Sequence, residues 1–207
     1  MADTYEVVWV SVPRWRGVAS HFNFDTTLDF LLFLLGGVAI VVTVTVIVAL
    51  TVLAFTAMQA PPSMALAIRA GLLILLVAQG VGGWMIGHGV GPASDGQSVD
   101  LTTFGAAGVM KVPHAVSMHA VQVLPALAWL VSFAAVNERR RLFLVRTAAL
   151  GYLALVMVGL LQAAAGVAPL DLRAATAGLF VLGLVLLSTA FLAGLLALGG
   201  PLASAGR

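Results

Sequence analysis

The sequence of 207 residues contains no cysteine. Its absence excludes disulfides, thiolate ligation of haem iron and iron–sulfur clusters together. Charge is scarce as well, because Asp, Glu, Lys and Arg make up only 9% of the residues. Soluble domains carry roughly a quarter of charged residues, so an ordinary soluble domain is also excluded.

The few charges nearly cancel, which gives a formal net charge of +2 and a sequence pI of about 9.7. These charges are spread along the chain and form no basic patch of the kind that binds nucleic acid, so we expect no such partner. The first thirty residues also lack the basic start and short apolar stretch of a secretory signal, so we expect no cleavable signal peptide.

Long apolar runs dominate the chain, which is 61% hydrophobic with a mean hydropathy of +1.10. About 20 residues rising 1.5 Å each cross the hydrocarbon core of a bilayer. The predicted fold class is therefore all-α, a polytopic membrane bundle of five transmembrane helices. Their approximate ranges are Phe30–Met58, Ser63–Ile86, Val112–Val136, Leu142–Val167 and Ala174–Leu198.

The chain divides into an N-terminal segment (1–29), a transmembrane domain (30–198) with a long loop at 87–111, and a tail (199–207). The N-terminal segment mixes charges with Trp9, Trp15, Phe22 and Phe24, and aromatic rings favour headgroup depth. We expect an interfacial anchor there, with a lid over the bundle as the alternative.

The orientation follows from the arginine cluster 139–141, because cytoplasmic loops carry the excess of basic residues. This rule predicts a protein of the cell membrane with the N-terminus outside and the C-terminus in the cytoplasm. All four histidines and every acid except Glu138 then lie in the outer half or outside.

The stretch from Gly82 to Gln122 holds three of the four histidines and the single lysine. Ionisable groups beside lipid are costly, so a functional site is the default interpretation. At about 100° per residue, one face of the third helix collects several polar and aromatic side chains, and we expect it to point inward. That face comprises His114, Ala115, Met118, His119, Gln122, Ala126 and Trp129.

We expect a pocket near the outer surface between the second, third and fourth helices, widened by a kink at Pro125. The glycine-rich end of the second helix, from Gly80 to Gly91, has two interpretations. Glycines permit close helix packing, or they mark irregular backbone that lines a cavity.

Such a pocket suits acid–base chemistry on a lipophilic substrate, because a carboxyl group removed from water stays protonated and an imidazole relays protons. The expected donor is Asp95 or Asp100, with Asp25 or Asp29 behind them. His114 and His119 are the expected relay or terminal base, and His88 belongs to the same group of catalytic candidates.

The expected substrate contacts come from aromatic and amide side chains. Aromatic faces stabilise a passing cation, and amides orient a substrate. The candidates are Trp84, Lys111, Gln122, Trp129, Tyr152 and Gln162.

Three alternatives stay open. His88 and His114 are candidate axial ligands of a b-type haem, because neutral imidazole is a usual haem ligand. A metal site from His88, His114, His119 and Asp95 is chemically suitable, but no HExxH-type spacing supports it. A non-enzymatic membrane binding or assembly role is the third.

Three sequence elements carry a resemblance: WMIGHGVG (Trp84 to Gly91), Asp95-Gly96 and KVPHAVSMHAVQ (Lys111 to Gln122). They resemble a large group of small bacterial membrane proteins. In size, helix number and apolar character the chain is also similar to bacterial membrane-bound terpene cyclases that act on farnesylated indole or diketopiperazine compounds in drimentine-type pathways. Lys111 departs from the broader group, where arginine is expected.

The resemblance implies a terpene cyclase that protonates the terminal alkene of a prenyl chain and builds a drimane-like ring system. It implies a lipophilic prenylated substrate in contact with membrane lipid, with neither cofactor nor metal.

Overall fold

The computed structural model describes residues 11, 15, 24, 26–95 and 108–199, with only the backbone of residues 92 and 93. Within these ranges the long elements are all helices, and no strand occurs. Each is long and apolar enough to cross a membrane, which confirms the predicted all-α fold of five spans. They are α2 (Thr27–Thr56), α3 (Pro62–Ser94), α5 (Lys111–Ser132), α6 (Glu138–Ala164) and α7 (Ala174–Leu198).

The largest difference from the predicted boundaries lies in α3, which continues to Ser94 rather than ending at Ile86. The first eight residues of the expected loop at 87–111 are therefore helical. Of the two interpretations of the glycine-rich stretch Gly80–Gly91, irregular backbone is wrong. A helix satisfies its own backbone groups, and that requirement in lipid outweighs the low helix propensity of glycine.

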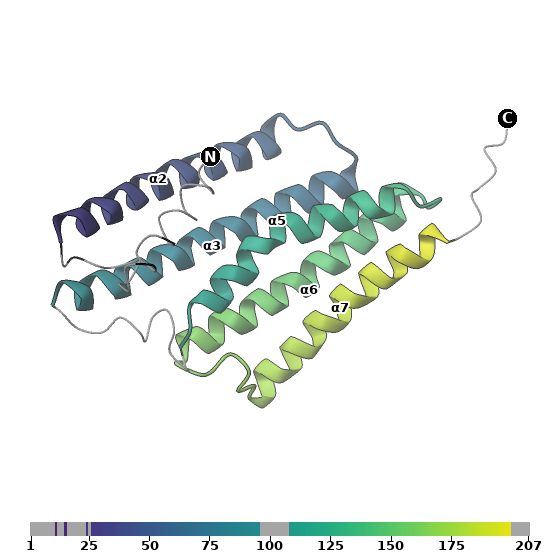
Figure 1. Ribbon diagram of the computed structural model, residues 1–207. Coiled ribbons are helices and arrows are strands. Elements are labelled where there is room, and N and C mark those ends of the chain that lie inside the picture. The colour runs from purple at the N-terminus through teal and green to yellow at the C-terminus, as the bar shows by residue number, and fades with distance from the viewer. Residues whose placement is uncertain (1–10, 12–14, 16–23, 25, 96–107, 200–207) are drawn as a thin grey trace.

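Three helices form the centre of the bundle, with α3, α5 and α6 each packed against the other two. Figure 1 shows α7 along α6 on one side and α2 beside α3 on the other, where α3 is its main neighbour. The buried core therefore lies between α3, α5 and α6, with a contribution from α7. Its larger members are Ile74, Leu124, Leu127, Val131, Leu144, Val145, Tyr152 and Val156.

Helix α2 is mostly exposed, as expected for a wall that faces lipid. Its threonines would be costly there, because lipid offers no hydrogen-bond partners. Four of the hydroxyls instead donate to the carbonyl four residues earlier, those of Thr43, Thr45, Thr51 and Thr56, at distances of 2.7–2.9 Å. The polar groups are thus satisfied within the helix.

Helix packing in the bundle depends on backbone contacts at glycines. A Cβ atom added at Gly151 would lie 2.7 Å from the carbonyl oxygen of Gly183, and one added at Gly71 would lie 2.8 Å from Cα of Val121. These distances are shorter than real Cβ contacts, so α6 with α7 and α3 with α5 approach as closely as glycine allows. Since lipid is as apolar as the side chains, such van der Waals contact is a main source of helix association.

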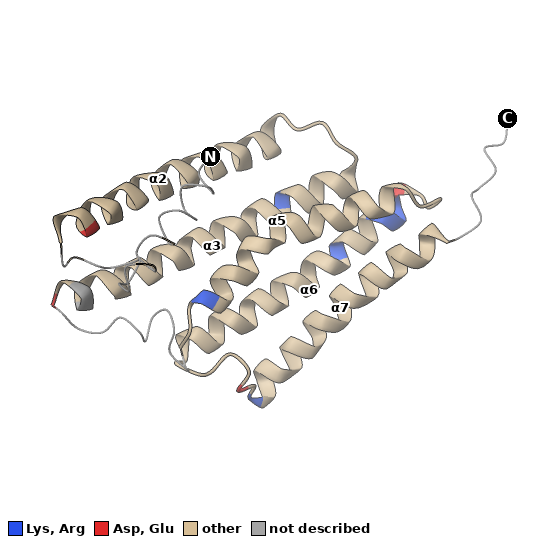
Figure 2. Ribbon diagram, viewed as in Figure 1, with Lys and Arg blue, Asp and Glu red and all other residues tan. Residues whose placement is uncertain are grey.

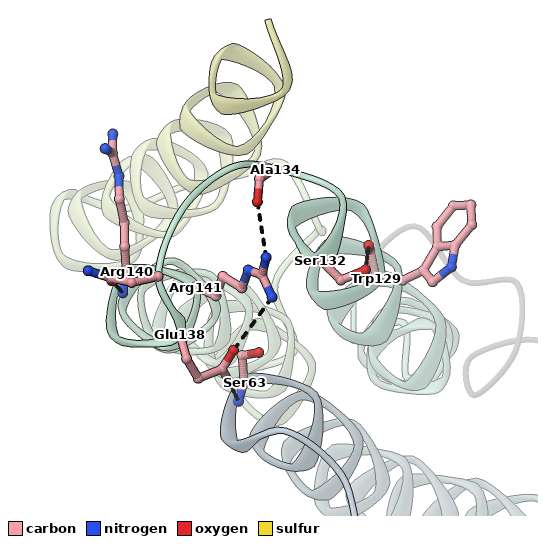
Figure 3. Close-up of polar contacts among 8 residues, drawn as sticks. Ser63, Trp129, Ser132, Ala134, Glu138, Arg140 and Arg141 are labelled. Carbon is pink, nitrogen blue, oxygen red and sulfur yellow. Dashed lines mark hydrogen bonds and ion pairs between the residues drawn. The ribbon is translucent and has the colours of Figure 1, made fainter. Parts of the chain in front are cut away.

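Most charged residues lie toward the two ends of the helices (Figure 2), whereas Arg69 and Arg146 lie about two turns inside α3 and α6. We call the end where α5 finishes and α6 begins the basic end, because it carries Arg139, Arg140 and Arg141. There the carboxylate of Glu138 accepts a hydrogen bond of 2.7 Å from the backbone N–H of Ser63, at the start of α3. Arg141 donates to the carbonyl of Ala134 at 3.0 Å, so the two side chains link the ends of three helices (Figure 3).

We expect Gly151→Ala to weaken the contact between α6 and α7, because the added methyl group meets the backbone of Gly183. The loss in unfolding free energy should be about 1–3 kcal/mol, as for other overpacked sites. Equilibrium unfolding of the purified protein in mixed micelles measures it. Gly178→Ala is the matched control on α7, where the added atom has nothing within 4 Å among the described residues. Equal stability of the two variants would contradict the prediction.

Candidate functional site

The polar face of α5 points away from the bundle, so the prediction that it faces inward is wrong. Met118 is 42% exposed and Trp129 is 60% exposed. The buried face is instead the one with Pro113, Ser117, Ala120, Leu124, Leu127 and Val131. Periodicity identifies which residues share a face, but it does not say whether the same chain covers that face. The other members Ala115, His119, Gln122 and Ala126 are exposed as well.

His114 is the exception, because its half-buried side chain reaches across to α3. Its Nδ1 lies 2.8 Å from the carbonyl oxygen of Ala78. A carbonyl only accepts, so Nδ1 carries the proton and, in the neutral ring, Nε2 holds a free lone pair. Gly82 makes room for the ring, since a Cβ there would lie 3.2 Å from Cε1 of His114. Contacts with α3 therefore fix the imidazole of His114 on α5, with Nδ1 as the donor and Nε2 as the acceptor.

The other two described histidines are bound within their own helices. His88 Nδ1 lies 3.1 Å from the carbonyl oxygen of Trp84, and the two rings meet edge to face at 5.8 Å. His119 Nδ1 lies 2.7 Å from Oε1 of Gln122. Both imidazoles are exposed.

The three imidazoles do not converge. On α3, His88 lies six residues beyond Gly82, which is about 9 Å along the axis and about 120° around it. On α5, His114 and His119 are five residues apart and point about 140° from each other. The geometry therefore does not pair His88 with His114 as axial haem ligands. No group of three His, Asp or Glu side chains among the described residues could hold a metal ion.

The structure does not place the acids expected to donate protons beside His114. Asp29 is buried beside the N-cap residue Thr26 at the start of α2, where Thr26 Oγ1 donates to its carboxylate at 2.6 Å and its backbone N–H donates to Thr26 Oγ1 at 3.2 Å. This arrangement satisfies one backbone N–H of the first turn and places an acid where negative charge suits the helix N-terminus. Asp95 is exposed just after α3. Asp25 and Asp100 lie outside the described residues.

The expected substrate contacts are also separated. Gln162 donates both amide hydrogens to the carbonyls of Ala168 (3.3 Å) and Asp171 (3.2 Å), so it holds the turn between α6 and α7. The Tyr152 hydroxyl is buried and donates to Val116 O at 2.6 Å. Both side chains have structural roles.

The two tryptophans lie at different levels of the bundle. Trp84 is half-buried against the small cluster of Val81 and Met110 near the start of α5. Trp129 packs on Phe133 with ring centroids 5.0 Å apart and points outward near the basic end (Figure 3). It is fifteen residues from His114, about 22 Å along α5. Lys111 is exposed at the first residue of α5, and Gln122 is bound to His119.

The chamber expected between the second, third and fourth helices is absent from the part of the chain that the structure describes. A shallow hollow among the described residues lies between the start of α5 and the end of α6 and has no room for a water molecule. Close contact fills the remaining space, because Pro113 lies within 3.2 Å of a Cβ built at Gly159. Val109, Val112, Gly159, Gln162, Ala163, Val167 and Pro169 line the hollow.

Comparisons with known protein families, with curated proteins and with solved structures found no match. The resemblance to membrane-bound terpene cyclases therefore stays a hypothesis. Functional interpretation rests on the residues themselves, and His114 is the candidate whose position two helices define.

The sequence analysis did not identify Gln79 as a candidate site residue. Gln79 lies at the centre of α3 beside Ala78, is half-buried and makes no side-chain hydrogen bond to another described residue. A lone amide inside a transmembrane run was the available signal, because such a group is costly in lipid. It adds a free polar group next to the turn of α3 that receives His114.

We expect nitrogen-15 NMR of histidine-labelled protein to show His114 with its proton on Nδ1. Gly82→Val should shift these resonances, because the new side chain occupies the space of the ring. Gly83→Val is the control, since a Cβ there meets nothing within 4 Å among the described residues. A proton on Nε2 in the unsubstituted protein, or equal shifts in both variants, would contradict this assignment.

Proposed function

We propose that this protein binds a lipophilic molecule in the membrane through a hydrogen bond from an N–H or O–H group of that molecule to Nε2 of His114. The observation that supports the proposal is the 2.8 Å contact of Nδ1 with Ala78, which leaves Nε2 as an acceptor. In a low-dielectric setting a fixed acceptor without competing water binds a donor strongly.

The surroundings of His114 suit an apolar ligand. On α3 the next residue along the same face as Gly82 is Ile86, and on α5 the next after His114 is Met118. Because the two helices run in opposite directions, these side chains lie on either side of the imidazole. Met118 is 42% exposed and flexible, so it can adapt to a hydrocarbon chain.

From the resemblance we further propose a catalytic form of this binding, the cyclisation of a prenyl chain on an indole-containing substrate. A proton adds to the terminal double bond, π-electrons of the chain form the ring bonds, and a base removes a proton, so the mass is unchanged. The free lone pair of His114 Nε2 suits the base. Asp95 is the described donor candidate that is not engaged in a helix cap, with Asp25 and Asp100 outside the described residues.

We expect His114→Phe to weaken binding of a farnesylated indole about tenfold, the effect of one hydrogen bond of about 1.4 kcal/mol. Titration calorimetry in lipid nanodiscs measures the affinity. The N-methylated indole lacks the hydrogen-bond donor. It should bind the unsubstituted protein about as weakly as the parent indole binds His114→Phe, and the substitution should not weaken its affinity further. His88→Phe is the matched control and should bind normally. If N-methylation and His114→Phe each weaken binding and their losses of binding free energy add when combined, the proposed hydrogen bond is contradicted.

The catalytic step has a separate readout. Cells that express the protein and are fed farnesylated indole should accumulate isomers of unchanged mass, and His114→Phe should abolish them. Normal binding without any isomer would reject the cyclase while retaining the binding protein.

For the orientation, we propose that the basic end lies in the cytoplasm and that the start of α5 lies near the outer surface of the cell membrane. The arginine excess at the basic end supports this orientation. Since the chain lacks cysteine, single-cysteine variants are specific reporters.

We expect an impermeant maleimide to label Ser94→Cys in intact cells and Arg139→Cys only after permeabilisation. Both positions are exposed in the structure, one at each end of the bundle. The reverse labelling pattern would invert the proposed topology.

A further inference from the structure

A hydrogen-bonded polar pair lies on the exposed side of α5, which faces away from the other helices, and it is far from either end of the helix. His119 and Gln122 are both exposed and sit near the middle of the 22-residue helix α5, with 2.7 Å between Nδ1 and Oε1. Polar and ionisable side chains within a span almost always face protein or a water-filled cavity, because lipid cannot bind them. We therefore expect a protein surface, rather than lipid, to contact this pair.

The groups left over by this hydrogen bond are complementary to each other. With Nδ1 as donor, His119 keeps an acceptor at Nε2 and Gln122 keeps its amide hydrogens. If the amide is turned over, His119 keeps a donor at Nε2 and Gln122 keeps an acceptor oxygen. In both cases an identical His–Gln pair on a facing surface can pair Nε2 of each histidine with the amide of the other glutamine, through an amide hydrogen in the first case and the amide oxygen in the second.

The residues around the pair form a regular exposed row along α5. Successive members are three or four residues apart, the spacing of helices that pack side by side. The small residues of the row, Ala115 and Ala126, flank Gln122 and allow two helices to approach closely. We call the following set the α5 outer row: Ala115, Met118, Gln122, Ala126, Trp129 and Phe133.

We propose that two copies of this chain associate through the α5 outer row, with His119 of each copy hydrogen-bonded to Gln122 of the other. A two-fold axis along the membrane normal places the same residues of both copies at the same depth. His119 and Gln122 are then about 4.5 Å apart along the axis, a distance that the long glutamine side chain spans. A partner of other sequence would need its own matching donor and acceptor at this depth, whereas a second copy carries them already. The inference goes beyond the proposed ligand binding and does not depend on it.

Single-cysteine variants test the interface in native membranes, because the chain has no cysteine of its own. Ala115→Cys and Ala126→Cys keep the polar pair intact and should form disulfide-linked dimers on mild oxidation, since crossing helices bring such positions within about 7 Å. Leu150→Cys, 62% exposed near the middle of α6, is the matched control and should stay uncrosslinked. Absence of crosslinks at both alanines, or a product whose mass is not twice that of the chain, would overturn the proposal.

The role of the polar pair is measured separately by energy transfer between labelled copies in lipid vesicles. Gln122→Leu and His119→Leu should each raise the dimer dissociation constant about three- to thirtyfold, the range for a hydrogen bond between transmembrane helices. Thr189→Leu on α7 is the control, because that exposed hydroxyl bonds only to its own helix. Circular dichroism verifies that each variant is folded. Association of Gln122→Leu and His119→Leu as tight as that of the unsubstituted protein would overturn the proposed pairing.

Discussion

A polar group within the hydrocarbon region has no water to bind, and this constraint accounts for several side-chain hydrogen bonds among the described residues. Tyr152 donates to a carbonyl of α5, and four threonines of α2 donate to carbonyls of their own helix. At the basic end Glu138 receives the free N–H of Ser63. The same requirement makes His114 and the His119–Gln122 pair informative. After the internal hydrogen bond is made, Nε2 of His114 can still bind a partner, and so can Nε2 of His119 and the amide of Gln122.

The bundle also illustrates how a membrane protein closes its centre without a hydrophobic driving force between helices. Glycines at Gly71, Gly151 and Gly183 bring backbones into contact, and Pro113 fits against Gly159. Contact of this kind leaves no chamber in the described core. The candidate site therefore changes from the expected interior pocket to the contact between His114 and α3.

The structure also separates roles that the sequence had combined. Asp29 and Gln162 are polar residues at helix ends. Asp29 is hydrogen-bonded to Thr26, the N-cap of α2, and Gln162 holds the turn after α6. Trp129, on the same helical face as His119, lies near the opposite end of α5 from His114. A short sequence segment contains many chemically suitable side chains, but a helix distributes them over different depths and directions.

Much of the architecture was determined by the sequence alone. Apolar runs of sufficient length predicted five spans, because the bilayer thickness fixes how many residues a helix needs. Composition excluded a soluble domain, and periodicity correctly placed Met118, Gln122 and Trp129 on one face of α5. Only the tertiary structure decided which way that face points, that α3 continues to Ser94, and that His114 alone of the described imidazoles bridges two helices. The reason is that periodicity is a property of one helix, whereas burial and convergence depend on which neighbours it meets and how closely glycines let them approach.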